Sequence, residues 1–245
     1  FSLGGIIIDG LSTDSPPIDN GGNVVLKNYF DNGSAVDDSA TLAFSRGVLS
    51  SRNRASSEEE LDLFLFNTIT SCGQTAISLV DTAKTAILHN TIDDCGNGFY
   101  GSGEIHNCVI KNNIFNEVGK SWDDIYLDFN DSAGAWLNDV YLGDDIPTEE
   151  ELTSYQTCYF DKNFYYRGIR GLQATGITQF RWKGKFYRLD GWTNNTDRFD
   201  AESSEALPGL INDSTKDFTL AETANARDFA DNVSVYYEDV SSWIK

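Results

Sequence analysis

Short apolar runs alternate with single asparagines along the first two thirds of the chain. In each phrase an apolar run reaches Asn or Gly, and apolar residues resume one or two positions later, as in residues 87–92 and 109–115. We call the Asn or Gly position the slot. Eight slots recur at intervals that lengthen from 18 to 25 residues: Gly10, Asn28, Gly47, Asn67, Asn90, Asn113, Asn138 and Asn163. Such a repeat predicts a solenoid in which each slot is a bend between two short strands.

The residue types at the slots suggest two roles for them. Asn and Gly accept a positive φ more readily than other residues, so each slot is expected to be the left-handed position of its bend. Asparagine amides in successive coils can also hydrogen-bond to one another along the stack.

A third strand is predicted in several coils, at residues 76–80, 98–101 and 124–128. Short strands, about twenty residues per turn and no helical period are typical of an all-β parallel β-helix. An antiparallel sandwich or barrel would instead show hairpin turns every 8–12 residues or so. We therefore predict a parallel β-helix solenoid of about eight coils.

The coils are expected to occupy residues 1–168. Residues 143–157 interrupt them with a capping-box pattern that predicts a short helix. Residues 169–245 are expected to form an irregular β cap over the open end of the same domain, with a strand–turn–strand at 180–187, short apolar pieces in polar loops at 207–210 and 217–220, and a final strand at 233–237. No comparable cap precedes the first coil, so another chain or a missing N-terminal segment is expected to stack before Phe1.

The register places the cysteines relative to one another. Cys72 and Cys95 each follow a slot by five residues, so they are expected on adjacent coils about 4.8 Å apart along the axis. That separation permits either a disulfide or two stacked, buried thiols. Cys108 and Cys158 each precede a slot by five residues, and the slot at Asn138 predicts one coil between them.

Composition narrows the classes of partner. The net charge is −20, with 38 acidic against 18 basic residues, which disfavours nucleic acid and anionic membranes as partners. No run of 18 apolar residues is present to span a membrane. No CxxC pair and only two histidines argue against a zinc site and a His-dependent nucleophile.

Taken together, the asparagine slots, the phrases LHNTIDDCGNG (88–98) and CVIKNNIF (108–115), and the pattern of residues 180–192 and 207–220 resemble the right-handed parallel β-helix, or pectate-lyase-like, superfamily. The slots resemble its asparagine ladder, and the last two segments resemble a C-terminal part common in secreted bacterial members. The resemblance implies a secreted or cell-surface protein. The superfamily includes polysaccharide lyases, glycoside hydrolases, epimerases, phage tailspikes and non-catalytic adhesins, and the resemblance does not distinguish among these functions.

The resemblance also implies that a substrate lies along the outer face of one parallel sheet. Strand alternation then predicts an exposed column of Ser78, Tyr100 and Tyr126, in which the two tyrosines would bind sugar rings. An ordinary solvated row of side chains is the alternative. Trp192 has two interpretations, as a sugar-stacking platform or as core of the C-terminal cap.

Paired carboxylates are the expected tools of glycoside cleavage. Asp94 with Asp124 or Asp128, on nearby coils, forms the candidate catalytic set, although aspartates in turns are the alternative explanation. Asp128, Asn130 and Ser132 place oxygen ligands at alternate positions and resemble the opening of a calcium loop, without its glycine and closing glutamate.

Two functions follow as hypotheses. The first is an extracellular protein that binds or cleaves polysaccharide, as a glycoside hydrolase or polysaccharide lyase if it is catalytic. The second is a non-catalytic surface, virion or fibre protein, or an adhesin, with the same fold. Two carboxylates converging across a cleft beside Tyr100 and Tyr126 would favour the enzyme.

Overall fold

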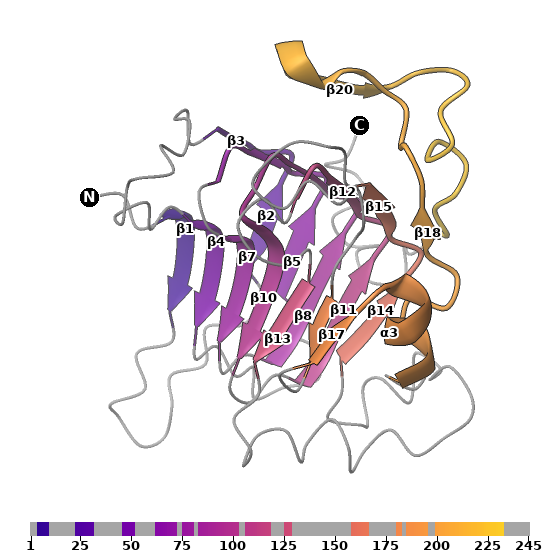
Figure 1. Cartoon of the computed structure of the whole chain (residues 1–245). Helices are drawn as coiled ribbons and strands as arrows, with labels where there is room; N and C mark the ends of the chain where they lie inside the picture. The colour runs from indigo at the N-terminus through magenta and orange to yellow at the C-terminus, as the bar shows by residue number, and fades with distance from the viewer. Residues whose placement is uncertain are drawn as a thin grey trace, which may run out of the picture.

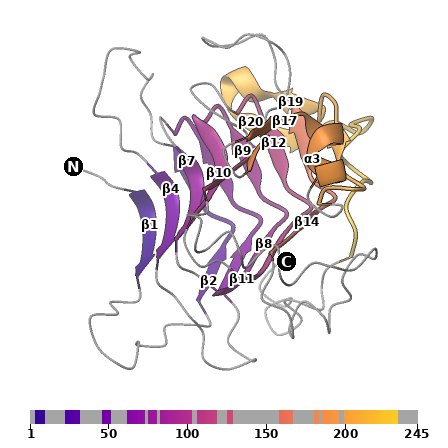
Figure 2. The same ribbon diagram turned by 60° about the horizontal axis from the view of Figure 1, so that its bottom comes forward.

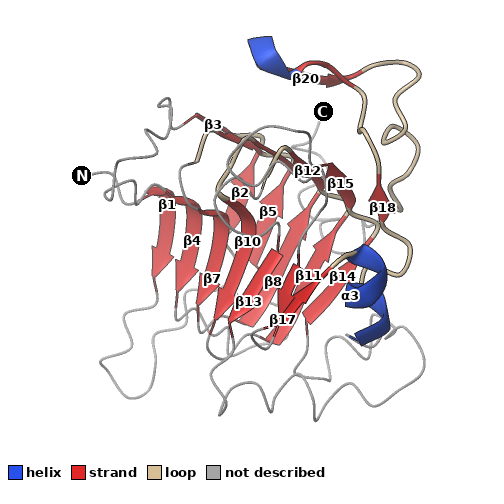
Figure 3. Cartoon of the chain, viewed as in Figure 1, coloured by secondary structure: helices blue, strands red, loops and turns tan. Residues whose placement is uncertain are grey.

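The chain folds almost entirely into β-strands, as a computed structural model shows (Figures 1 and 3). The residues that the structure describes are 4–9, 23–31, 46–51, 62–72, 75–80, 83–102, 106–118, 125–128, 158–166, 180–182, 185–195 and 199–232. The predicted helix at 143–157 and the predicted strand at 233–237 lie outside these residues.

Most strands belong to three sheets. Sheet A runs in the order β1 (Gly4–Asp9), β4 (Arg46–Ser51), β7 (Thr75–Val80), β10 (Asn97–Ser102), β13 (Ile125–Asp128), β16 (Phe180–Trp182) and β17 (Lys185–Tyr187). Sheet B runs β14 (Cys158–Asp161), β11 (His106–Lys111), β8 (Ala83–Leu88), β5 (Asp62–Leu65) and β2 (Val24–Leu26). Sheet C runs β18 (Ser204–Glu205), β15 (Phe164–Tyr166), β12 (Ile114–Asn116), β9 (Thr91–Asp93), β6 (Thr68–Thr70) and β3 (Tyr29–Asp31).

The chain visits the sheets in turn, from B to C to A and back to B. Every pairing in sheets A, B and C is parallel except that of β16 with β17. Strand colours in Figure 1 therefore change in sequence order along the stack, and Figure 2 shows the same order after rotation. This arrangement of stacked parallel sheets is compatible with a β-helix-like solenoid. The strands predicted around Asn28, Asn67, Asn90, Asn113 and Asn163 are confirmed.

Each of these asparagines lies at the bend that joins a strand of sheet B to the next strand of sheet C. We call the two strands and their bend a bend unit, and the five form an asparagine ladder. Asn90 shows the pattern: its Oδ1 accepts hydrogen bonds from Asn67 N and Nδ2 at 2.9 and 3.0 Å, and its own N and Nδ2 donate to Asn113 Oδ1 at 2.9 and 3.0 Å. The predicted coupling between successive asparagines is therefore confirmed.

The predicted backbone role of the slot is wrong. The positive φ belongs to the residue before each ladder asparagine, at 55° for His89 and 59° for Asn112. Asparagine is needed at the slot because its amide supplies one acceptor and two donors along the buried stack.

Three other slots do not belong to the ladder. Gly47 lies within β4, in sheet A, and the run before Gly10 forms β1, which pairs with β4 in the same sheet. Asn138 lies outside the described residues, and Asn113 donates directly to Asn163 Oδ1 at 3.0 and 3.1 Å. The intervals along the ladder are thus 39, 23, 23 and 50 residues, so the steady lengthening was a coincidence of spacing.

The direct hydrogen bonds from Asn113 to Asn163 also correct the predicted spacing of the cysteines. Cys108 and Cys158 are directly paired positions of β11 and β14, with no strand between them. Cys72, Cys95 and Cys108 are buried free thiols, so the first two follow the stacked-thiol alternative. Burial raises the pKa of Cys95, and a hydrogen bond with Cys72 raises it further.

The C-terminal part continues the stack before leaving it. The predicted strand–turn–strand is confirmed as β16 and β17, an antiparallel pair. Helix α3 (Leu189–Asn195), which the sequence did not indicate, follows directly. A two-stranded sheet of β19 (Leu210–Asn212) and β20 (Asp217–Leu220) encloses the short 3-10 helix η1 (Asp213–Thr215) and stands apart from the main sheets in Figure 1.

Candidate functional site

A second row of residues accompanies the asparagine ladder, one position earlier in each bend. We call this row the outer column: Lys27, Phe66, His89, Asn112 and Lys162. All five have φ between 52° and 59°. Parallel pairing stacks the bends about 4.8 Å apart, so the outer column is as regular as the ladder, but it carries four residue types, with lysine at both ends.

Four members of the outer column, all except Lys27, line a cavity of about 500 Å³. Its opposite wall comes from residues 217–232, which we call the C-terminal strap. The lining residues are Phe66, His89, Asn90, Thr91, Asn112, Asn113, Ile114, Lys162, Phe164, Phe218, Thr219, Leu220, Ala226, Arg227, Phe229 and Ala230. None of them is acidic, in a chain whose net charge is −20. A cavity of this size and mixed polarity suits a small polar ligand or one unit of a polymer.

Aromatic side chains form part of both walls. Phe66 and His89 stack face to face, with centroids 4.8 Å apart and rings within 2° of parallel. From the strap, Phe229 meets Phe164 edge-on at 5.2 Å. Lys162 Nζ lies 5.6 Å above the Phe229 ring, a cation–π distance.

His89 is a neutral ring in this site. Burial lowers its pKa to about 4, so the imidazole carries no charge near neutral pH. Its Nε2 lies 3.4 Å from Asn112 Nδ2. A neutral imidazole has one donor and one acceptor nitrogen, which suits hydrogen bonding to hydroxyl groups.

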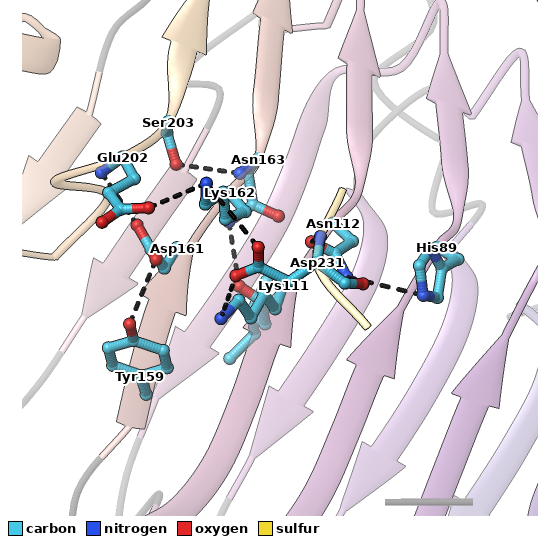
Figure 4. A network of polar contacts seen from close by, with 11 residues as sticks. His89, Lys111, Asn112, Tyr159, Asp161, Lys162, Asn163, Glu202, Ser203 and Asp231 are labelled. Atoms are coloured by element: carbon cyan, nitrogen blue, oxygen red, sulfur yellow. Dashed lines mark hydrogen bonds and ion pairs between the residues drawn. The ribbon is translucent and has the colours of Figure 1, made fainter. Parts of the chain in front are cut away.

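The strap is held to the outer column through Asp231 (Figure 4). The side-chain amide of Asn112 pairs with the backbone of Asp231 through two hydrogen bonds, as a neighbouring strand would. Its Nδ2 donates to the Asp231 carbonyl at 2.9 Å, and Asp231 N donates to its Oδ1 at 3.1 Å. The Asp231 carboxylate pairs with Lys111 at 2.9 Å and Lys162 at 3.7 Å. These lysines outweigh the effect of burial and lower the pKa of Asp231.

Lys162 joins the strap to the end of the stack. Its Nζ lies 2.8 Å from Glu202 Oε2, and this hydrogen bond is the main reason that its pKa is raised. Lys162 is therefore protonated at neutral pH and is a poor general base. Directly before the strap, the Lys216 ammonium pairs with Asp31.

The predicted column on sheet A is only partly present. Parallel pairing aligns Tyr100 with Ser78 on one side and with Tyr126 on the other, as expected. Ser78, however, is fully buried, so the prediction that it is exposed is wrong; its Oγ has no hydrogen-bond partner among the described residues. Tyr100 is half-buried, and the side chain of Tyr126 lies outside what the structure describes.

The described residues do not test whether the candidate catalytic aspartates come together. Asp94 lies at a bend after β9 with φ of 56°, and its N donates to Asn116 O at 3.1 Å. Asp124 lies outside the described residues, and Asp128 is described only as the backbone partner of Ser102. Convergence of two carboxylates therefore stays a prediction.

Trp192 follows the core interpretation. It is fully buried, stacks on Phe180 at 5.1 Å, and donates its indole N–H to Asp200 Oδ2 at 2.8 Å. Its ring is therefore not available as a sugar platform.

The candidate calcium ligands can be followed only in part. Asn130 and Ser132 lie outside the described residues, as does the side chain of Asp128. Within the described ranges, no three His, Cys, Asp or Glu side chains converge in a way that would hold a metal ion. No helix in that part of the chain is long and apolar enough to cross a membrane.

Comparison of the chain with protein-family models, with curated proteins and with solved structures finds no significant match.

The outer column and the strap were not predicted as a site. The column had a positional signal, because each member directly precedes a ladder asparagine, but its residue types vary. The strap had no local signal, since Asp231 and Asn112 are 119 residues apart in sequence.

Proposed function

We propose that the protein is a right-handed parallel β-helix of the pectate-lyase-like kind, and that it binds an extracellular polysaccharide. The repeated order of the three parallel sheets and the asparagine ladder support the fold. The cavity between the outer column and the C-terminal strap supports the binding function.

The observation that carries this proposal is the composition of the cavity wall. Rings of Phe66, His89 and Phe229 offer apolar faces, and the lining also includes the hydroxyl groups of Thr91 and Thr219 and the guanidinium of Arg227, which can hydrogen-bond. Sugar rings need this combination, because they present apolar C–H faces together with hydroxyl groups.

The same wall favours binding over cleavage. Glycoside hydrolysis uses a pair of carboxylates about the scissile bond, and none of the described residues that line the cavity is acidic. A lyase needs a base to remove a proton, and the ion-paired, protonated Lys162 is unsuited to that task. We therefore place binding ahead of catalysis at this cavity.

A second candidate surface is favoured by one observation. Tyr100 and Tyr126 are adjacent in the register of sheet A, next to the backbone of Asp128. A cleaving site would belong on this surface, with Asp94, Asp124 and Asp128 as its acids, and the experiment must separate the two surfaces.

The test titrates the protein with neutral and acidic polysaccharides and, in parallel, assays new reducing ends and absorbance from unsaturated products. We expect binding of at least one polysaccharide without product. Phe229→Ala should weaken binding roughly tenfold by removing an aromatic contact, whereas Tyr100→Ala should leave it within about twofold. Near-ultraviolet circular dichroism checks that both variants fold.

Three results would contradict the proposal: no binding to any polysaccharide, release of products, or a loss of binding confined to Tyr100→Ala. The second result would move the function to the sheet A surface.

A further inference from the structure

The three sheets do not end at the same level on the side of the first bend unit. Strand β2 is the last strand of sheet B, and β3 is the last strand of sheet C. In sheet A, β4 follows β3 in the chain, yet it pairs on its far side with β1. Among the described strands, sheet A therefore extends one strand beyond its neighbours and leaves a step beside β2 and β3 (Figures 1 and 2).

Exposure confirms that this step is less covered than equivalent positions further along. All four residues of β5 are buried, whereas only the central residue of β2 is. In sheet C, Phe30 is half-buried, but its paired counterpart Ile69 is 1% exposed. Tyr29 is 51% exposed. The outer edge of the first bend unit thus retains accessible apolar side chains.

The asparagine ladder has a direction that determines what this edge can accept. Each interior Oδ1 receives two N–H groups from the asparagine on its β2 side, as Asn67 Oδ1 receives Asn28 N and Nδ2 at 2.9 and 3.1 Å. Asn28 is the first described member, and no described residue donates to its Oδ1. The open end of the ladder is therefore a hydrogen-bond acceptor.

The amide nitrogen of Asn28 points to the same conclusion. In the interior, Asn67 Nδ2 donates to the Val25 carbonyl and Asn90 Nδ2 to the Phe64 carbonyl, each in the bend unit on its β2 side, at 2.9 Å. Asn28 Nδ2 donates to the Leu26 carbonyl of its own unit at 3.1 Å, as Asn90 Nδ2 also does to the Leu88 carbonyl, but among the described residues it has no carbonyl partner on its β2 side. Asn28 has the side-chain pattern of an interior ladder residue that lacks one neighbour.

We propose that the edge formed by β2, Asn28 and β3 binds a strand–bend–strand segment of a different polypeptide. The segment adds one parallel strand to sheet B and one to sheet C. An asparagine at its bend donates N and Nδ2 to Asn28 Oδ1. The edge therefore recognises a second β-repeat protein with an asparagine at an equivalent bend, and this inference does not depend on glycan binding.

A second copy of this chain does not meet that requirement. Its equivalent edge presents the acceptor of Asn28, which cannot donate to another acceptor. At the far end of the ladder, Asn163 Nδ2 donates to Asp200 Oδ1 at 2.9 Å, and this buried carboxylate also receives the Trp192 indole N–H. Neither end of the ladder thus offers a free donor, which is why the partner is a different polypeptide.

The probe is a labelled peptide of residues 83–93, whose own strand–bend–strand carries Asn90. Fluorescence anisotropy measures its binding to the intact protein. A matched peptide with Asn90→Asp keeps the shape but has no side-chain donor. We expect saturable binding of the first peptide and roughly tenfold weaker binding of the second. The aspartate side chain cannot donate a hydrogen bond to Asn28 Oδ1, and its negative charge faces that acceptor oxygen. Absence of binding, or equal binding of the two peptides, would overturn the proposal.

A pair of protein variants locates the peptide on the edge. Lys27 N donates to Leu65 O in β5, so the alternating N–H of Val24 faces away from β5. Val24→Pro removes that outward donor at the first residue of an edge strand, where proline is tolerated. We expect roughly tenfold weaker peptide binding for Val24→Pro and less than about threefold change for Val24→Ala.

Equal binding to the two variants would place the peptide elsewhere and overturn the proposal. The peptide pair decides the question alone if the proline variant does not fold. Sedimentation of the protein without peptide completes the test: self-association that Val24→Pro abolishes would make the occupant a second copy and contradict a different polypeptide.

Discussion

The asparagine ladder and the outer column occupy neighbouring positions of the same bends, but the first stabilises the stack and the second faces the cavity. The asparagine ladder repeats the same residue in every described bend unit and is largely buried, with its amides hydrogen-bonded from unit to unit. The outer column, one residue earlier, has the same left-handed backbone conformation at all five positions but four different residue types. Uniformity is required where each residue bonds to its own repeat, and variety is possible where the residue faces a cavity and the strap.

Asp200 ends the ladder and should be the most costly residue to replace. Its carboxylate accepts from three buried donors, Asn163 Nδ2, Tyr165 OH and Trp192 Nε1, and from the half-buried Ser203 Oγ. Asp200→Ala leaves these donors unpaired, so we expect the free energy of unfolding in urea to fall by about 4 kcal/mol. Tyr165→Phe removes one donor and should cost about 1 kcal/mol. Similar costs for the two variants would contradict a carboxylate-centred network.

The same carboxylate should make stability depend on pH. Burial raises the pKa of Asp200 from 3.8 to about 6, against the lowering effect of its hydrogen bonds. Below about pH 4 the Asp200 carboxyl is protonated in both the folded and the unfolded state. Between about pH 4 and 6 the unfolded state has released its proton while the folded state still holds it, so the free energy of unfolding falls as the pH rises. Relative to Asp200→Asn, wild-type stability should fall by about 3 kcal/mol between pH 4 and 7. A flat difference would show that Asp200 is ionised throughout.

The contacts of the outer column should be much weaker than those of the ladder. Asp231→Asn keeps the backbone pairing with Asn112 but removes the charge facing Lys111 and Lys162. The Asp231 side chain is 43% exposed, so solvent screens the pairs and the expected loss at pH 7 is at most about 1 kcal/mol.

Because the lysines lower the pKa of Asp231, this contribution is present above its ordinary pKa and disappears as pH falls. It should also shrink in 1 M salt, as denaturation at two ionic strengths would show. A loss as large as that of Asp200→Ala would remove the distinction between the two rows.

Ser78 allows the effect of burial on stability to be measured without that of a hydrogen bond. It is as buried as Asn67, Asn90, Asn113 and Asn163, but its Oγ has no hydrogen-bond partner in the part of the chain that the structure describes. Ser78→Ala should therefore raise the free energy of unfolding by roughly 0.5–1 kcal/mol, because an unpaired buried hydroxyl is removed. A loss of stability in thermal and urea unfolding would indicate that Ser78 contributes an interaction of its own.

The sequence predicted the strands and the ladder where residue type is tied to a repeated contact. It misplaced Gly47 and Asn138 because an apolar–Gly or apolar–Asn phrase does not specify which sheet receives it, and loop lengths of the repeat are free to vary. Local sequence patterns could not predict the cavity, because it forms only where the strap contacts Asn112, and Asp231 of the strap is 119 residues from Asn112 in sequence. The burial of Ser78 and Trp192 likewise depends on packing that alternation alone cannot supply.

The most direct test compares adjacent residues, His89→Asn and Asn90→Ala, in unfolding free energy and in affinity for a bound polysaccharide. Asparagine at 89 accepts the left-handed backbone, so that variant removes only the ring. The account predicts a loss of about 4 kcal/mol for Asn90→Ala and at most about 1 kcal/mol for His89→Asn, whose polysaccharide affinity falls roughly tenfold. Equal destabilisation by both, with affinity unchanged by His89→Asn, would contradict it.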